Sequence, residues 1–194
     1  DAYQLHTWPE ANGALVQVAS QFNLLEMPGY EVTPEAGVSD YEHDHTQGPA
    51  CARATGAATI YRNYFAPVGD QIGQTRDRQI DTLADLRAAL PRGDEIEMRN
   101  GYALATPEIL QAIHDKLAVI CEAERDALRT LLRIGLHHEV DVTAMGALLG
   151  QRVSQAYCSA LPVNYNHGTD PATWTSFASL VLEAAYEATL HAAV

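Results

Sequence analysis

The sequence predicts an α/β protein with three layers, in which helices cover both faces of a mixed central sheet. Segments with strand and helix character alternate along most of the chain. A strand pattern at 15–20 lies near its beginning, and a second at 153–161 lies near its end. Between and after them run small-residue and amphipathic segments with helical period. Because ligands of such folds bind beyond the carboxyl ends of the strands, we expect residues 21–23 and 158–160 to lie near a ligand.

The first half of the chain combines one strand, one long loop and one helix of small residues. Leu15-Val-Gln-Val-Ala-Ser20 alternates apolar and polar side chains, which is typical of a strand. Residues 27–48 hold several prolines, glycines and carboxylates and predict a loop with one short turn. Loops of that length inside a domain are usually functional. Pro49 then occupies the first position of a helix predicted over 49–64.

The second half of the chain predicts a hairpin among further helices and strands. Apolar residues with helical period predict a helix over 76–90, which Pro91-Arg92-Gly93 ends. Asn100-Gly101 is the signal for a two-residue hairpin turn between 95–98 and 102–105. The remaining expected elements are a helix from Thr106 to about Arg129, strands at 132–138 and 153–161, and an amphipathic helix from Asp170-Pro171 to Leu190.

Length and composition favour a single domain over residues 1–194 and restrict its partners. The net charge of −13 argues against binding to a nucleic-acid backbone, since too few Lys and Arg are present to displace its counterions. No run approaches the roughly 20 apolar residues that cross a bilayer, so no membrane partner is expected. Three widely spaced cysteines match neither a disulfide framework nor a zinc motif, which favours a reducing compartment such as the cytoplasm. The chain begins with Asp rather than Met, so we expect it to have been excised from a longer protein or trimmed at its N-terminus.

The segment that leads into the helix at 49–64 has the features of a phosphate site. The first turn of a helix offers unpaired N–H groups and the positive end of the helix dipole. At the other end of this helix, Arg62 has a guanidinium that can pair with a phosphate through two N–H groups. The candidate ligand contacts are Gln21, Phe22 and Asn23 after the first strand, Thr46, Gln47, Gly48 and Pro49 at the helix start, Arg62 and Asn63 at its end, and Ser159 at the end of the last strand. An Ala-rich helix buried against a sheet is the plain structural alternative.

Two aspartates are the best candidates for catalysis. Cleavage of a glycosidic bond needs carboxylates near the anomeric carbon, to activate water and to stabilise an oxocarbenium-like transition state. Asp44 lies just before the predicted phosphate site, where its carboxylate could stand beside a sugar attached to the phosphate. Asp77, Asp81 and Asp85 share one face of the predicted helix over 76–90. Asp81 ranks second, because Ile80 and Leu83 fix neighbouring helix faces against the core and Asp81 could then point into a cleft. For both aspartates, a solvated acidic surface is the structural alternative.

A metal-dependent hydrolase is a competing hypothesis. Glu42-His43-Asp44-His45, together with His137-His138, could bind zinc through imidazole and carboxylate groups. The spacing matches no specific metal motif, so neutral loop histidines fit the pattern better, and we expect no metal and no cofactor. Ser159 follows Cys158 without a Gly-x-Ser-x-Gly elbow, which argues against a Ser or Cys nucleophile.

Six blocks of sequence are distinctive and extend over about residues 15 to 190. They are Val18-Ala-Ser-Gln-Phe-Asn-Leu-Leu-Glu-Met27, Asp44-x-Thr-Gln-Gly-Pro-Ala-Cys-Ala52, Tyr61-Arg-Asn-Tyr-Phe65, Gln79-Ile-Asp81, Asn100-Gly-Tyr-Ala-Leu104 and Cys158-Ser-Ala-Leu-Pro162. Together they resemble a divergent macrodomain group, the MavL-type arginine-specific ADP-ribosylhydrolases. The resemblance implies an α/β/α macrodomain over the whole chain, with ADP-ribose bound in a cleft at the ends of its sheet.

The resemblance also implies an activity and roles for individual residues. Asn23 would lie near the distal ribose, Gln47-Gly48-Pro49 would line the pyrophosphate, and Asp44 and Asp81 would supply catalysis. The Gly-rich loops of ordinary macrodomains are absent, so phosphate contacts must come from other backbone. We therefore expect an ADP-ribosylhydrolase whose partners are ADP-ribose and ADP-ribosylated protein, with arginine as the modified side chain. The alternative is a module that binds ADP-ribose without cleaving it.

Overall fold

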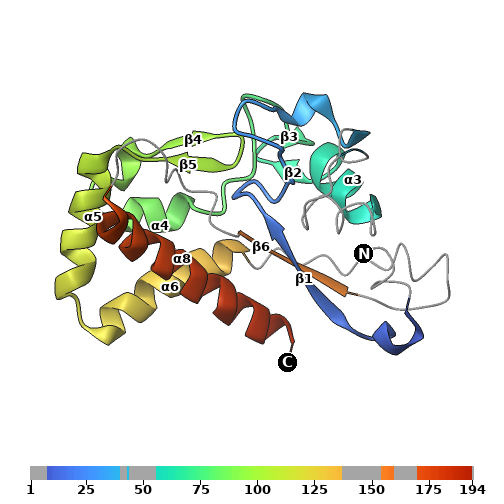
Figure 1. The fold of residues 1–194 in the computed structure, drawn as a ribbon. Coiled ribbons are helices and arrows are strands. Elements are labelled where there is room, and N and C mark those ends of the chain that lie inside the picture. Colours follow the sequence, from blue (N-terminus) through green and yellow to red (C-terminus); the bar gives the residue numbers. More distant parts are fainter. Residues whose placement is uncertain (1–7, 40–42, 44–55, 137–153, 160–169, 194) are drawn as a thin grey trace.

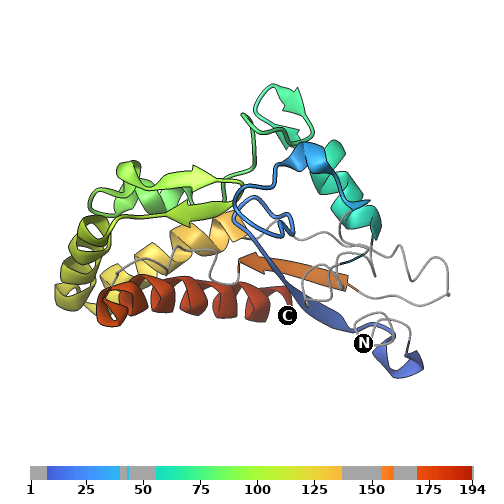
Figure 2. The same ribbon diagram turned by 45° about the horizontal axis from the view of Figure 1, so that its top comes forward.

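The computed structural model of the chain describes residues 8–39, 43, 56–136, 154–159 and 170–193. Helices and short two-stranded sheets are mixed within these residues, in agreement with the predicted α/β class (Figure 1). The elements are η1 (Pro9–Ala11), β1 (Leu15–Ser20), η2 (Pro34–Ala36), α3 (Gly56–Tyr64), β2 (Pro67–Val68), β3 (Gln71–Ile72), α4 (Ala84–Ala89), η4 (Gly93–Glu95), β4 (Glu97–Arg99), β5 (Tyr102–Leu104), α5 (Pro107–Val119), α6 (Glu122–Leu136), β6 (Ser154–Ser159) and α8 (Pro171–Ala192). In both views, α4, α5, α6 and α8 gather with the β4–β5 hairpin, while α3 and the β2–β3 hairpin lie on the other side (Figures 1 and 2).

The strands predicted near the two ends of the chain pair with each other. β1 and β6 run parallel, with Leu15 opposite Ser154 and Ser20 opposite Ser159. The carboxyl ends of both strands therefore lie side by side. The segment that leaves β1, residues 21–27, begins at this edge, which is where ligands bind in open α/β sheets.

The hairpin predicted around Asn100-Gly101 is confirmed. β4 and β5 are antiparallel, with Arg99 opposite Tyr102 and only two residues between them. Both turn residues have positive φ, 47° for Asn100 and 80° for Gly101, as a type I′ turn requires. Asn and Gly tolerate this conformation better than other residues, which is why the dipeptide predicts the turn.

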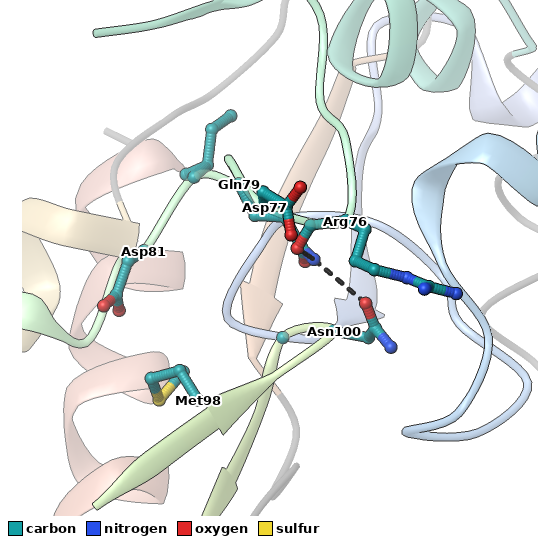
Figure 3. A pocket seen from close by; sticks show the side chains of 8 residues that line it. Arg76, Asp77, Gln79, Asp81, Met98 and Asn100 are labelled. Atoms are coloured by element: carbon teal, nitrogen blue, oxygen red, sulfur yellow. Dashed lines mark hydrogen bonds between the residues drawn. The ribbon is translucent and has the colours of Figure 1, made fainter.

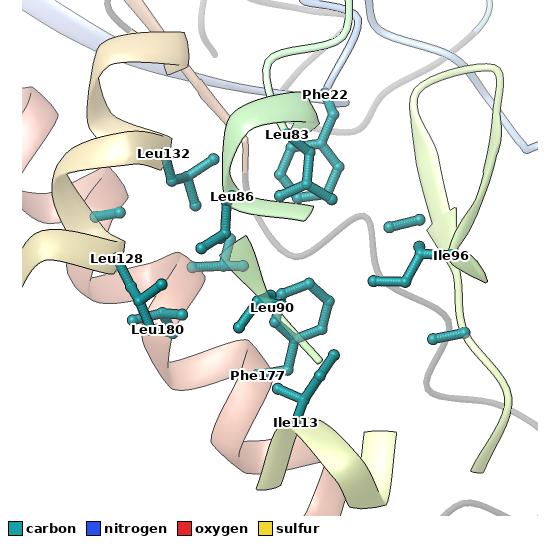
Figure 4. Close-up of a cluster of buried hydrophobic side chains, with 14 of the residues drawn as sticks. Phe22, Leu83, Leu86, Leu90, Ile96, Ile113, Leu128, Leu132, Phe177 and Leu180 are labelled. Carbon is teal, nitrogen blue, oxygen red and sulfur yellow. The ribbon is translucent and has the colours of Figure 1, made fainter. Parts of the chain in front are cut away.

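The hydrophobic core lies among α4, α5, α6 and α8 (Figure 4). α8 packs against both α5 and α6, and α6 packs against α4. The face of α8 predicted to be apolar is buried, with Phe177, Leu180 and Val181 completely inaccessible to solvent. Phe22, which follows β1, and Leu86 from α4 belong to the same core. The segment after β1 is therefore anchored to the helical part of the molecule.

Ion pairs join α6 to α8 along the edge of this core. The guanidinium of Arg125 lies 2.6 Å from Glu183 Oε1, and Arg129 Nε lies 2.9 Å from Glu187 Oε1. The hydrogen bonds from Arg125 lower the pKa of Glu183, and Arg129 adds to the effect. Arg133, one turn further along α6, also reaches Glu187. These charges fix the two helices in register.

The helix predicted over 76–90 forms only at its end. α4 spans Ala84–Ala89, and the residues before it follow an irregular path. Three hydrogen bonds hold that path, from Ile80 N to Gln74 Oε1, from Leu83 N to Asp81 Oδ1, and from Thr82 N to Phe22 O. Side-chain and long-range acceptors thus take amide hydrogens that a helix would use. Asp77 and Asp81 consequently do not share a helical face with Asp85, and that prediction is wrong.

The single helix predicted from Thr106 to Arg129 is two helices. Thr106 caps α5 as expected, because its hydroxyl accepts a hydrogen bond from the N–H of Ile109. Ile120 is extended, with φ −75° and ψ 151°, which ends α5. Glu124 then accepts a hydrogen bond of 3.0 Å from Cys121 N, as the third residue of a capping box does, and α6 begins.

The strand predicted at 132–138 is also wrong within the described residues. Residues up to Leu136 continue α6, and Leu132 is completely buried on the helix face that meets the core. Its neighbours Arg129 and Arg133 lie on the side that meets α8. Arg129, Leu132 and Arg133 thus have the spacing of one amphipathic helix, and the segment is helical although its apolar run suggests a strand.

Across the residues that the structure describes, there is no helix with both the length and the apolar character needed to cross a bilayer.

Candidate functional site

Three segments far apart in the sequence meet beyond the carboxyl end of β1. They are the segment after β1, residues 21–27, the irregular segment 74–82, and the tip of the β4–β5 hairpin. Phe22 N donates to Gly101 O at 2.9 Å, which joins the first segment to the hairpin tip. Thr82 donates to Phe22 O from its N–H at 3.0 Å and from its hydroxyl at 2.8 Å. The backbone of Phe22 is therefore held from both sides.

Side-chain amides form a second layer of connections between these segments. Asn23 Nδ2 donates to Gln79 Oε1 at 2.8 Å, and Gln79 Nε2 donates to Asn100 Oδ1 at 2.9 Å. Figure 3 shows the latter bond across the site. Asn100 Nδ2 in turn donates to Tyr30 O at 2.7 Å. This amide chain fixes the orientation of Gln79 and ties it to the hairpin turn.

The close approach of the hairpin tip depends on a glycine. A Cβ atom at Gly101 would lie 2.5 Å from Asn23 Oδ1 and 2.5 Å from Gln21 Cβ. Gln21 itself accepts a hydrogen bond of 2.6 Å from Met27 N and donates to the hydroxyl of Tyr102 at 3.3 Å. Gly101 therefore serves both the turn conformation and the contact.

The end of α3 is tied to the same cluster through Gln74. The buried side chain of Gln74 donates to Asn23 O at 2.9 Å and to Arg62 O at 3.2 Å. Gln74 N donates to Asn63 O at 2.7 Å. One glutamine thus connects α3, the segment after β1 and the irregular segment.

A pocket of about 170 Å³ opens between the irregular segment 74–82 and the β4–β5 hairpin (Figure 3). Its lining combines two carboxylates, a guanidinium, two amides and two apolar side chains. The lining residues are Arg76, Asp77, Gln79, Ile80, Asp81, Met98, Asn100 and Gly101. A site with charges of both signs and hydrogen-bonding amides suits a polar, charged ligand.

Asp81, one of the two predicted catalytic residues, lines this pocket with both of its oxygens engaged. Oδ1 accepts a hydrogen bond of 3.0 Å from Leu83 N, and Oδ2 forms an ion pair with Arg87. The guanidinium of Arg87 also donates to Ile96 O at 3.2 Å. The side chains of Asp81 and Arg87 are 28% and 20% exposed, so this pair is partly shielded from water.

Asp77 is the second carboxylate of the pocket. It is exposed, and within the described part of the chain its carboxylate has neither an ion-pair nor a hydrogen-bond partner. The backbone around it is fixed, since Thr75 and Arg78 exchange two backbone hydrogen bonds of 2.9 and 3.2 Å across a two-residue turn. The N–H of Arg76 in this turn donates to Glu35 at 2.7 Å and lowers the pKa of Glu35.

Several residues predicted to contact a ligand have internal positions instead. Asn23 is completely buried, and its amide binds Gln79 and the N–H of Leu25. Phe22 is a core residue. Arg62 is 2% exposed and Asn63 is 3% exposed, with the amide of Asn63 donating to Pro34 O. The side chains of these predicted contacts thus belong to the framework behind the pocket, while Gln21 is half-buried beside it.

Other predicted residues lie outside the described part of the chain. They are Asp44, Thr46, Gln47, Gly48 and Pro49 of the predicted phosphate site, and His45, His137 and His138 of the zinc hypothesis. Ser159 ends β6 opposite Ser20. His43 is described and is exposed. Over the described residues, no group of three or more His, Cys, Asp or Glu side chains is arranged to hold a metal ion.

Sequence reasoning missed four residues that shape the pocket, namely Arg76, Asp77, Gln79 and Asn100. Gln79 and Asn100 stand inside two of the distinctive sequence blocks, which was an available signal. The predicted helix puts Asp77 on a charged, solvated face, and nothing local to Arg76 distinguishes it from other exposed arginines.

No protein-family model, no curated protein and no solved structure matches this chain.

Proposed function

We propose that the chain is an ADP-ribosylhydrolase that removes ADP-ribose from modified protein side chains, most simply from arginine. One observation carries the proposal. Three of the distinctive sequence blocks, residues 18–27, 79–81 and 100–104, meet through the bonds from Asn23 to Gln79 and from Gln79 to Asn100. The second and third of these blocks contribute to the lining of a pocket that contains two carboxylates, and carboxylates are the groups that glycosidic cleavage uses.

The finer fold that we propose is a three-layer macrodomain with a mixed sheet. Two features support it. β1 and β6 are parallel neighbours, and the pocket-lining residues Gln79 and Gly101 are hydrogen-bonded to the segment that follows the carboxyl end of β1. This is the edge at which α/β folds bind nucleotides. The widely spaced cysteines fit a reducing compartment such as the cytoplasm.

The chemistry adds water across the bond between ribose C1″ and a guanidinium nitrogen. The hydroxyl group of water goes to C1″, and the bonding electron pair leaves with the nitrogen, which takes up a proton. One carboxylate accepts the proton of water, and a second steadies the positive charge that develops on the ribose. Asp77 and Asp81 supply two such groups in one pocket, and Asp44 remains the other proposed catalytic residue.

A second function, binding of ADP-ribose without cleavage, is favoured by one observation. Both oxygens of Asp81 are already engaged, by Leu83 N and by Arg87. If no other carboxylate acts on the sugar, the pocket would hold the nucleotide without reacting with it.

The test incubates the chain with protein carrying ADP-ribose on arginine, glutamate or serine and measures released ADP-ribose by mass spectrometry. We expect release from arginine, and slower release by the Asp44→Asn and Asp81→Asn variants. If both variants remain folded and release ADP-ribose at the wild-type rate, the assignment of these aspartates is refuted. Tight ADP-ribose binding by calorimetry, with no release from any linkage, would instead establish the binding module.

A further inference from the structure

We propose that Asp77, and not Asp81, is the carboxylate that accepts the proton of the attacking water, while Arg87 positions Asp81 to steady the ribose. This inference rests on the proposed hydrolase function. It assigns separate roles to the two carboxylates, and it adds Asp77 and Arg87 to the residues on which the reaction depends.

The contacts of Asp81 favour a role other than that of the base. A general base must present an oxygen to the water whose proton it takes. One oxygen of Asp81 receives the N–H of Leu83, and the other receives the guanidinium of Arg87. Arg87 is itself anchored to Ile96 O, so the pair has a fixed position. A carboxylate held in this way can provide a fixed negative charge next to the positive charge that develops on the ribose in the transition state.

The contacts of Asp77 point to the opposite role. Asp77 lines the pocket, and among the described residues no other group is hydrogen-bonded to its carboxylate oxygens (Figure 3). The turn that carries it is fixed by the paired hydrogen bonds of Thr75 and Arg78 and by the bond from Arg76 N to Glu35. The backbone is thus rigid while the carboxylate stays available for water.

The amides in the pocket do not compete for this role. Gln79 Oε1 accepts from Asn23, and Gln79 Nε2 donates both to Asn100 Oδ1 and to Arg76 O. Asn100 uses its own Nδ2 on Tyr30 O. These amides hold the shape of the pocket, and amides do not accept protons near neutral pH. Among the described lining residues, Asp77 is the one carboxylate whose oxygens accept no hydrogen bond from another described residue.

The step balances as follows. The water oxygen bonds to C1″ of the distal ribose, and one water proton passes to Asp77. The C1″–N bond breaks, and its electron pair leaves with the nitrogen as a neutral guanidine. That guanidine takes the proton from Asp77, so the products are ADP-ribose and protonated arginine, and Asp77 returns to its carboxylate form.

The experiment measures kcat and KM for release of ADP-ribose from an arginine-ADP-ribosylated peptide. The variants are Asp77→Asn, Asp81→Asn, Arg87→Lys and Arg87→Met. Asp85→Asn is the matched control, because Asp85 is an exposed aspartate on α4 that does not line the pocket. Thermal unfolding of each variant reports whether it is folded.

We expect Asp77→Asn to lower kcat by about 10²–10⁴-fold, the usual effect of losing a general base, with KM within about twofold and an unchanged unfolding temperature. Arg87→Met should impair turnover as Asp81→Asn does, and the double variant should be no worse than either alone. Arg87→Lys should recover part of the activity, because it restores a positive charge. Asp85→Asn should behave as the wild type.

The outcomes separate this inference from the proposed function. If the wild-type chain releases ADP-ribose and Asp77→Asn retains the wild-type kcat, the role of Asp77 is overturned while the hydrolase function stands. The same holds if Asp85→Asn lowers kcat as much as Asp77→Asn, since the effect would then come from net charge. If the wild-type chain itself releases nothing from any linkage, the function and this inference fail together.

Discussion

Replacement of Gly101 by alanine tests whether the hairpin tip really lies against the segment after β1. The added Cβ would lie 2.5 Å from both Asn23 Oδ1 and Gln21 Cβ, closer than real Cβ contacts. The φ of 80° adds strain of about 1–2 kcal/mol for an L side chain. Overpacking of this kind costs about 1–3 kcal/mol more, so we expect Gly101→Ala to destabilise the fold by about 2–5 kcal/mol.

Gly13→Ala is the matched control for this prediction. Gly13 has the same φ of 80°, but a Cβ there would meet no atom within 4 Å. It should therefore lose only the strain, about 1–2 kcal/mol. Urea unfolding of both variants measures the two free energies of unfolding. Equal losses in the two variants would refute the close approach of Gly101 to Asn23, and with it the assembly of the pocket.

Other predictions concern the core, the ion pairs and a helix cap. Leu86→Ala should lower the free energy of unfolding by about 2–5 kcal/mol, because Leu86 is fully buried. Leu182→Ala, at an exposed position, should change it by less than about 0.5 kcal/mol. Urea unfolding measures both values. Glu183→Gln should destabilise by at most about 1 kcal/mol at pH 7, because the pair is partly screened by solvent. The lowered pKa of Glu183 means that this difference should shrink as pH falls through that pKa, and in an Arg125→Met background it should be smaller, because only Arg129 then pairs with Glu183. Asp170→Ala should cost about 1 kcal/mol through loss of the α8 cap, and an unchanged denaturation midpoint would contradict the cap.

Elements with local signals were predictable from the sequence. Asn100-Gly101 forms the predicted two-residue hairpin turn, because the two residue types tolerate positive φ without help from the rest of the fold. Thr106 and Asp170 cap the helices that they were expected to begin, each before a proline in the first helical position. In each case the deciding interaction spans no more than a few residues.

Elements decided by distant partners were not predictable. The periodicity over 76–90 is real, but Phe22 accepts two hydrogen bonds from Thr82, and those bonds replace a turn of helix. The strand predicted at 132–138 is wrong because α6 turns Leu132 into the core and Arg133 toward Glu187 of α8, and both partners lie on distant segments.

The candidate site was only partly predictable, because distant partners also decide how its side chains are placed. The apolar neighbours of Asp81 in the sequence predict that it points into a cleft, and it does line the pocket. Its ion pair with Arg87 is visible only in the three-dimensional structure. The predicted helix puts Asp77 on the same charged face as Asp81 and Asp85, and no apolar neighbour singles it out as Ile80 and Leu83 do Asp81. Arg62 was expected to reach a phosphate, but it is buried, since α3 packs against the segments that Gln74 joins.

A crystal structure of the chain with bound ADP-ribose tests the central claim most directly. We expect the distal ribose in the pocket between residues 76–81 and the hairpin tip, with its C1″ close to Asp77 and the carboxylate of Asp81 still paired with Arg87. ADP-ribose bound at another place on the chain, with this pocket holding only solvent, would contradict the proposed site and the function built on it.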